Sequence, residues 1–374
     1  MADSRYCSIV DCALCRKLPL KLDLDLDLVE EIPKELKKLS TVLSFDLEPE
    51  HEYSSNTVEL LKCPKCGTYY YFNHFVDEGE HFMDPTSNDV SIRRYPPLAV
   101  IRFLEGIINK IPGTFPQPLG KLRDAFLEDT YPYPNEISEK ERREKLKIVI
   151  AELNEIKGRY RTVIEEFINI IRNHPPEWHL KKYIVDSLLM HFINEDDWSS
   201  ISNLMLKHRD PIIRVEALKF LAGFCSGDAA VTDILHIPND ILEKLEKILT
   251  KKSQLDEIIQ VASKLALSDH GHTYHYDGLF GKYYPHKVQY DALYCIRVLA
   301  EYAGVSKLIP QLVDLLSEED ESLNFEVCWT LKRISEQNKE DAKLILGAIK
   351  SKADSRIMRS QEVQELIKEC SERE

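Results

Sequence analysis

Four cysteines near the start of the chain form two pairs with the same spacing. The first pair is Cys12 and Cys15, the second is Cys63 and Cys66, and two residues separate the members of each pair. Two short turns of this kind can bring four sulfurs to one point, and four thiolates complete the tetrahedral shell of a structural zinc ion. The spacing therefore predicts a zinc site with these four cysteines as its ligands.

The second pair lies in the segment Cys-Pro-Lys-Cys-Gly at residues 63–67, between two strand-like stretches. Proline presets the turn, and glycine tolerates the left-handed conformation that closes it. The first pair lacks both residues, so Cys7, His74 and His81 stay open as alternatives for the fourth ligand. A redox motif is less favoured because it belongs at a helix start, whereas a hairpin is expected here. The remaining alternative is a pair of hairpins with buried thiols and no metal.

The two cysteine pairs and their flanking strands resemble a zinc ribbon, in which two turns face each other across a small three-stranded sheet. We expect this head to occupy residues 1–95. A shell closed by four ligands leaves no position for a substrate, so the resemblance implies a structural zinc. Zinc ribbons often bind nucleic acid or proteins, which leaves nucleic-acid binding through the ribbon as an alternative.

Two further elements are expected within the head. Residues 18–28 carry leucine at every even position, and this period of two predicts a half-buried strand. Asp23, Asp25 and Asp27 would share its polar face, which favours a solvated edge over a cation site. Residues 30–39 predict a short amphipathic helix with a proline in its first turn.

Composition limits the class of protein. The 374 residues exceed one ordinary domain, and a hydrophobic content of 43% with 13 glycines indicates a folded, helix-rich chain. We see no membrane-spanning run or signal peptide, and nine cysteines in such a chain favour reduced thiols. We therefore expect a cytoplasmic protein. The net charge of −14 disfavours nucleic acid and favours a basic protein partner.

Helical patterns dominate after residue 95. Prolines and glycines cluster over residues 96–137, which predicts a connecting region with short helices such as 98–110. A capping box at Ser138–Glu141 begins a long amphipathic helix that extends to about residue 172. Five later segments align on a small or branched residue at their centres, thirty to forty-five positions apart, as stacked helix pairs require. The segments are 178–193, 210–224, 255–268, 286–303 and 320–335.

These segments resemble HEAT and armadillo-type α-solenoids, and residues 210–218 (Asp-Pro-Ile-Ile-Arg-Val-Glu-Ala-Leu) carry the resemblance best. We therefore expect a mainly α protein: a HEAT-like solenoid of stacked helix pairs over residues 138–374, with a small zinc-ribbon-like β region before it. Such a solenoid implies a protein-binding role, because stacking creates a long concave face. Candidates for that face are Lys219, Asp291, Arg297, Glu326 and Lys332.

Residues 268–286 interrupt the helical pattern and predict a loop rich in histidine and tyrosine. Tyrosines give large contact areas at low entropic cost, so we favour a partner-binding loop. The alternatives are a metal site with open coordination positions and a packed connector. Its candidate partner-binding residues are His270, His272, Tyr274, His275, Tyr276, Tyr283, Tyr284 and His286, and the metal alternative uses His270, His272, His275 and Asp277.

We see no phosphate-binding glycine loop, nucleophile elbow or His-Glu-x-x-His motif. The sequence therefore predicts a non-enzymatic scaffold or adaptor that binds a protein partner. Neutralisation or regulation of that partner is a further expectation, by analogy with HEAT-like bacterial immunity proteins. The competing hypothesis is a metal-dependent enzyme built on the histidine-rich loop.

Overall fold

The computed structural model describes residues 6–18, 21–25, 34–47, 54–77, 87–109, 139–173, 178–226, 237–268, 273–277, 283–301, 304–317, 320–352 and 356–373. The chain forms two compact units. The first comprises Met1–Glu195, Leu235–Leu242 and Asp277–Tyr283, and the second comprises Asp196–Ile234, Glu243–Tyr276 and Tyr284–Glu374.

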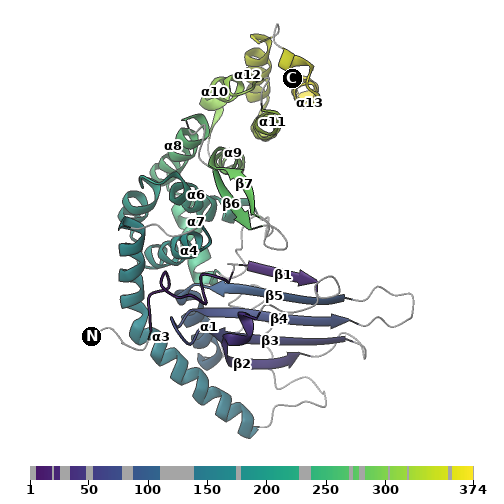
Figure 1. Ribbon diagram of the computed structural model, residues 1–374. Coiled ribbons are helices and arrows are strands. Elements are labelled where there is room, and N and C mark those ends of the chain that lie inside the picture. The colour runs from purple at the N-terminus through teal and green to yellow at the C-terminus, as the bar shows by residue number, and fades with distance from the viewer. Residues whose placement is uncertain are drawn as a thin grey trace. The chain divides into compact units, whose positions relative to one another are not determined.

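The first unit contains an antiparallel five-stranded sheet (Figure 1). Its strands are β1 (Lys21–Asp25), β2 (Ser40–Leu47), β3 (Ser54–Lys62), β4 (Tyr69–Asp77) and β5 (Ser87–Tyr95), in the order β1-β5-β4-β3-β2. The strand-turn-strand expected around residue 65 is confirmed as the β3–β4 hairpin, in which Lys62 pairs with Tyr69. The predicted three-stranded sheet has too few strands, because β2 and β5 also join it and the sheet has five.

The structure also tests the strand and the helix that the sequence predicted for the head. The strand expected over residues 18–28 is present as β1, which pairs with β5 at the edge of the sheet. The helix expected over residues 30–39 was wrong in length: within the described residues it is a single 3-10 turn, Leu36–Lys38, because β2 begins at Ser40.

Helices α1 (Pro97–Asn109) and α3 (Glu139–Asn173) bury their apolar faces against one face of the sheet. Apolar residues of β2, β3, β4 and β5 meet those of the two helices in one core. Its most buried members include Val58, Leu60, Tyr71, Tyr95, Phe103, Leu104 and Val149. The helix expected at 98–110 and the long helix expected to 172 are therefore present as parts of this core.

This packing shifts the boundary between the units. We expected the helical array to begin at residue 138, but the first unit runs through Glu195 and includes α3 and α4 (Trp178–Asn194). The difference arises because α3 packs on the sheet rather than on another repeat. Residues 110–138, which hold most of the expected connecting region and the capping serine, lie outside the described residues.

The second unit is helical. Its helices are α5 (Trp198–Ser200) with the π-helical turn Ile201–Leu206, α6 (Pro211–Ser226), α8 (Lys252–Ser268), α9 (Val288–Leu299), α10 (Ile309–Asp314), α11 (Glu321–Ser335), α12 (Lys339–Lys350) and α13 (Gln361–Arg373), with most of α7 (Asn239–Leu249). Helix α9 packs between α6 and α8 and also contacts α11, which in turn contacts α13 (Figure 1). All five aligned segments form helices, so the mainly α fold with an N-terminal sheet is confirmed.

The expected loop at 268–286 contains two short strands. Strands β6 (Thr273–Asp277) and β7 (Tyr283–Lys287) form a two-stranded sheet, so a purely irregular loop was the wrong expectation for these residues. Alternating tyrosines suit a strand, although the glycines around them favoured a loop. Across the part of the chain that the structure describes, no helix combines the length and apolar character needed to cross a bilayer.

Candidate metal centre

Two loops of the first unit position the cysteines. Cys63 and Cys66 lie in the tight turn between β3 and β4, where the amide of Cys63 donates to Thr68 O (2.8 Å) and the amide of Gly67 donates to Cys63 O (2.9 Å). Cys12 and Cys15 lie in the turns of residues 6–18, where no strand forms. The Cys7 amide joins the two loops by donating to Lys65 O at 2.9 Å.

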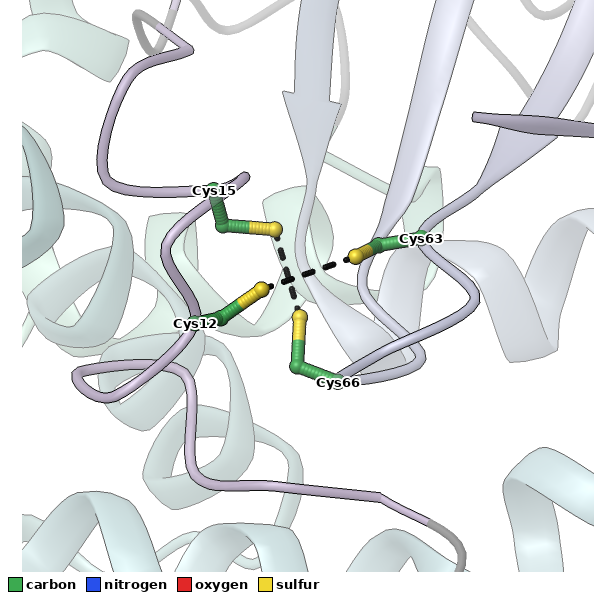
Figure 2. A group of neighbouring side chains, drawn as sticks. All are labelled: Cys12, Cys15, Cys63 and Cys66. Atoms are coloured by element: carbon green, nitrogen blue, oxygen red, sulfur yellow. Dashed lines mark hydrogen bonds between the residues drawn. The ribbon is translucent and has the colours of Figure 1, made fainter. Parts of the chain in front are cut away.

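The four sulfurs converge on one point, as Figure 2 shows. All lie within 4.8 Å of one another, with 3.7 Å between the sulfurs of Cys12 and Cys63 and 3.2 Å between those of Cys15 and Cys66. Four ligands about 2.3 Å from a zinc ion stand about 3.8 Å apart in a tetrahedron. The cluster can therefore hold a metal ion after adjustments of less than an ångström or so at each thiol.

The structure also decides among the alternative ligands. All four cysteines of the cluster are buried, whereas Cys7 is exposed and lies beside Cys12 rather than among the four converging sulfurs, so the four cysteines stay the favoured ligands. His74 forms a hydrogen bond of 2.9 Å with Asn88 across β4 and β5. His81 lies outside the described residues.

Without an ion, the thiols share protons unequally. Hydrogen bonds from Cys15 and then Cys66, together with backbone amides of the turn, lower the pKa of Cys63. The same contacts with Cys15 and Cys63, reinforced by burial, raise the pKa of Cys66. One thiolate held by protonated neighbours is a ready first ligand, and binding of a metal would release the remaining protons.

Arg94 lies next to the cluster and is buried, with only 2% of its surface exposed. Its Nη2 donates to Cys15 O (2.7 Å) and Leu18 O (2.8 Å), while Nε and Nη1 have no hydrogen-bond partner. Because arginine stays protonated, a buried guanidinium requires negative charge nearby. This requirement suits a cluster of thiolates better than a cluster of neutral thiols.

Arg159 of α3 packs onto the β3–β4 turn. Its Nη2 donates to Cys66 O (3.2 Å), its guanidinium lies 3.8 Å from the centre of the Tyr6 ring, and a side chain at Gly67 would collide with it. Gly67 has φ = 73°, the left-handed conformation that the sequence predicted for the turn. The backbone conformation therefore requires glycine, whereas the tip of the Arg159 side chain would have to move to admit a larger residue.

A buried ionic network supports the hairpin from the helix side, and sequence analysis missed it. Lys62 is 7% exposed, and its ammonium group contacts Glu152 (2.8 Å) and Glu155 (2.6 Å) of α3. Tyr69 donates to Glu152 and Tyr6 to Glu155, each at 2.6 Å. The lysine next to a metal-ligand cysteine was visible in the sequence, but its partners lie some ninety residues away.

The expected partner-binding residues are only partly placed. Tyr274, His275 and Tyr276 lie in β6, and Tyr283, Tyr284 and His286 lie in β7. His270 and His272 lie outside the described residues. Both roles of this segment, partner binding and metal binding, stay predictions.

The candidates for the concave face mostly pair with one another. Lys219 of α6 contacts Asp291 of α9 (3.6 Å), and Arg297 of α9 contacts Glu326 of α11 (3.1 Å). Lys332 of α11 contacts Glu369 of α13 at 2.6 Å. These charges link helices of the second unit that pack against one another, and three of them, Lys219, Asp291 and Arg297, are largely buried.

An exposed aromatic pair lies on α11 instead. Phe325 and Trp329 are 49% and 47% exposed, with ring centres 5.6 Å apart. Both line a groove between α11 and α13 that also contains Leu366 and the carboxylates of Glu362, Glu365 and Glu369. Sequence analysis missed this pair, although its spacing of four residues on a helix was a usable signal.

Comparison with known proteins supports the helical class. Residues 299–336 match the armadillo/beta-catenin-like repeat family, and this segment spans the end of α9, α10 and α11. No curated protein matches the chain. An engineered protein of known structure is similar over 73% of this chain and 72% of its own, with 15% identity and a TM-score of 0.29, a similarity too low to support any argument. The second unit therefore carries an armadillo-like repeat, a fold typical of protein-binding scaffolds.

Proposed function

We propose that this protein is a non-catalytic scaffold that binds a protein partner through the groove between α11 and α13. The exposed pair Phe325 and Trp329 is the observation that carries the proposal. Both side chains belong to the segment that matches the armadillo repeat. Large aromatic residues left half exposed on an ordered helix are characteristic of protein-binding hot spots.

The walls of the groove indicate the chemistry of the partner. Three glutamates and one lysine line it, and the lysine is already paired with Glu369. A second hollow, on the other side of Phe325, is lined by Glu321 and Glu326 as well as Tyr290. An apolar floor between acidic walls fits a segment that combines apolar residues with lysine or arginine. The net charge of −14 favours the same class of partner.

Neighbouring side chains hold the Trp329 ring of the aromatic pair in place. The guanidinium of Arg297 lies 3.8 Å from the centre of the Trp329 ring, and its ion pair with Glu326 holds it there. The indole therefore packs on a cation while 47% of the residue stays exposed and available for contact. Preorganisation lowers the entropic cost of binding.

We further propose that the cysteine cluster holds a structural zinc ion and that the protein acts in the cytoplasm. Four thiolate ligands close the coordination shell, so this centre would stabilise the fold and leave no position for a substrate. Neutralisation or regulation of the partner follows as one use of such a scaffold, and the β6–β7 segment would supply additional contacts.

The test compares protein partners captured by cross-linking on the full chain and on two matched variants. Phe325→Ala with Trp329→Ala removes the aromatic pair, and Leu344→Ala removes a residue of α12 that is also exposed (53%). We expect one set of proteins to be lost with the double variant and retained with the control. The affinity of a purified partner should fall at least tenfold in the double variant.

Two results would contradict the proposal. Equal capture by all three proteins would show that the aromatic pair is not a binding site. Retention on DNA that weakens with salt and persists in the double variant would favour nucleic-acid binding through the head. Charge reversal by Glu362→Lys and Glu365→Lys tests the partner's class, because a basic segment should then bind more weakly.

A further inference from the structure

Arg94 is a buried cation that forms no ion pair with a carboxylate in the part of the chain that the structure describes. Within the described residues, the groups that interact most strongly with its charge are Tyr70, Cys15, Tyr183 and Cys66, and none of these is a carboxylic acid. Its side chain is among the largest that are wholly buried in the protein. Such a cation must be compensated by other negative charge in its surroundings.

The position of Arg94 is fixed by the sheet. It lies on β5 directly opposite Tyr70 of β4, and its guanidinium is 5.4 Å from the ring centres of both Tyr70 and Tyr183. Nη2 is used by the carbonyl oxygens of Cys15 and Leu18. The first of these carbonyls belongs to a cysteine of the cluster, so the guanidinium is anchored to the loop that carries two of the four thiols.

Two nitrogens of Arg94, Nε and Nη1, have no hydrogen-bond partner. The hydroxyl of Tyr70, across the sheet from Arg94, interacts with the thiol of Cys15. Buried donors next to the ligands are what an anionic metal centre requires, because such neighbours orient the ligands and offset their charge. Neutral thiols would leave the guanidinium uncompensated.

A divalent ion with four thiolates carries two negative charges, and burial of such a dianion is unfavourable without a nearby cation. We propose that Arg94 is the internal counter-cation of a metal–tetrathiolate centre formed by Cys12, Cys15, Cys63 and Cys66. The cationic guanidinium offsets the negative charge of the centre and, through the carbonyl oxygens of Cys15 and Leu18, ties its loop to β5. This inference rests on the proposed zinc site and does not depend on the partner-binding role.

Charge separates this role from simple packing. In the metal-bound protein Arg94 stabilises the dianion, whereas in the metal-free protein it is a buried cation beside largely protonated thiols. Removal of its charge should therefore weaken metal binding and destabilise the metal-bound form more than the metal-free form, which loses only the hydrogen bonds to Cys15 and Leu18. A side chain that only fills space would change both forms alike.

The experiment uses the full chain and zinc ion as the probe. Zinc affinity is measured by competition with a chromophoric chelator for wild type, Arg94→Met, Arg94→Lys and Arg93→Met. Arg93 is the matched control because it neighbours Arg94 on β5 but pairs in register with Tyr71, on the other face of the sheet. Thermal unfolding of each protein is recorded with zinc and with excess chelator.

We expect Arg94→Met to weaken zinc binding at least tenfold, Arg94→Lys to weaken it by a smaller factor, and Arg93→Met to change it less than threefold. The unfolding temperature of Arg94→Met should fall further below that of wild type with zinc than in excess chelator, where only the hydrogen bonds to Cys15 and Leu18 are lost. Unchanged zinc affinity in Arg94→Met would overturn the inference. Equal destabilisation with and without zinc would also overturn it, because Arg94 would then act by packing alone.

A second variant keeps the test valid if Arg94→Met does not fold. Cys12→His replaces one thiolate by a neutral ligand and lowers the negative charge of the centre by one, away from the recorded partners of Arg94. Arg94→Lys should then affect zinc affinity less in the Cys12→His protein than in wild type, and an equal effect would contradict a charge-based role. Failure of wild type to bind zinc would refute the zinc proposal itself. A zinc affinity that stays the same in the Arg94 variants would refute only this inference.

Discussion

The ammonium group of Lys62 lies 2.6 Å from a carboxylate oxygen of Glu155, although the two residues are 93 positions apart. Lys62 ends β3, one residue before a cysteine of the cluster, and Glu155 lies in the middle of α3. This ion pair, with Glu152 as a second acceptor, connects the long helix to the hairpin that carries half of the candidate metal site.

Lys62→Met should destabilise the first unit. The change removes the cation that Glu152 and Glu155 share and leaves Glu155 with Arg159 alone, at 3.9 Å. Removal of one partner of a buried pair costs about 3 kcal/mol or more, and less here because both carboxylates keep some exposure and Glu155 keeps this second cation. Hydrogen exchange at the amides of β3 and β4 in moderate urea measures the loss. The control Lys147→Met breaks an exposed pair with Glu144 and should cost less than about 0.5 kcal/mol. Equal protection in both variants would contradict a stabilising role for the network.

The same network predicts how stability depends on pH. Burial raises the pKa of Glu155, but hydrogen bonds from Lys62 and Tyr6 more than offset it, so the net pKa lies below the usual value of 4.5. A carboxyl with a lowered folded pKa contributes stability above its unfolded pKa and loses it as pH falls through the folded pKa. Thermal unfolding of metal-free protein between pH 2 and 6 should show this loss, and Lys62→Met should reduce it. The same acid dependence in wild type and variant would refute the assignment to Glu155.

Alkaline pH should act on the lysine. Burial lowers the pKa of Lys62, but the hydrogen bonds with Glu152 and Glu155 outweigh it, and the net pKa lies above 10.5. The stabilisation is therefore complete below the unfolded pKa and is lost only as pH rises through the folded value. We expect the contribution of Lys62, measured as the difference from Lys62→Met, to stay constant from neutral pH to about pH 10. A contribution that disappears below pH 9 would contradict the raised pKa.

Gly67→Ala and Gly158→Ala should have opposite effects. At Gly67 the positive φ opposes a side chain, and Arg159 would have to shift its guanidinium away from the turn, so we expect a loss of about 1–2 kcal/mol and weaker metal binding. Gly158 lies in α3 with open space around it, so alanine there should stabilise the helix by about 0.5–1 kcal/mol. Denaturant unfolding and zinc titration measure both. A neutral Gly67→Ala would show that the turn relaxes without cost.

Zinc content tests the metal centre directly. Elemental analysis and native mass spectrometry should find one zinc per chain in wild type and in Cys7→Ser, which changes an exposed thiol outside the cluster. Cys63→Ser with Cys66→Ser should lose it, because two ligands remain. Removal of zinc should reduce hydrogen-exchange protection at residues 63–68 and leave α11 unchanged. A second metal that survives the cysteine changes would favour the enzyme hypothesis at the histidine-rich segment.

Much of the candidate site was predictable because its determinants are local. The turn at Cys63–Gly67 depends on proline, glycine and thiol chemistry within five residues, and the structure places both cysteine pairs together as their spacing predicted. The helical repeats were predictable for the same reason, since apolar periodicity over one or two turns specifies which face is buried. The β6–β7 strands were missed because glycine content and strand propensity conflict within a few residues.

The sequence by itself determined the class of the fold and the chemistry of the four thiols, since both follow from residue types at short spacing. Only the tertiary structure decided which distant residues share one environment. Pairing of β5 with β4 brings Arg94 beside the cysteines, and packing of α3 on the sheet brings Glu155 to Lys62. The packing of α11 beside α13 also leaves Trp329 exposed. The sequence pattern of α11 alone does not reveal which residues of that helix its neighbours cover. Burial and charge compensation depend on contacts between segments far apart in the chain, and such contacts form only when the whole unit folds.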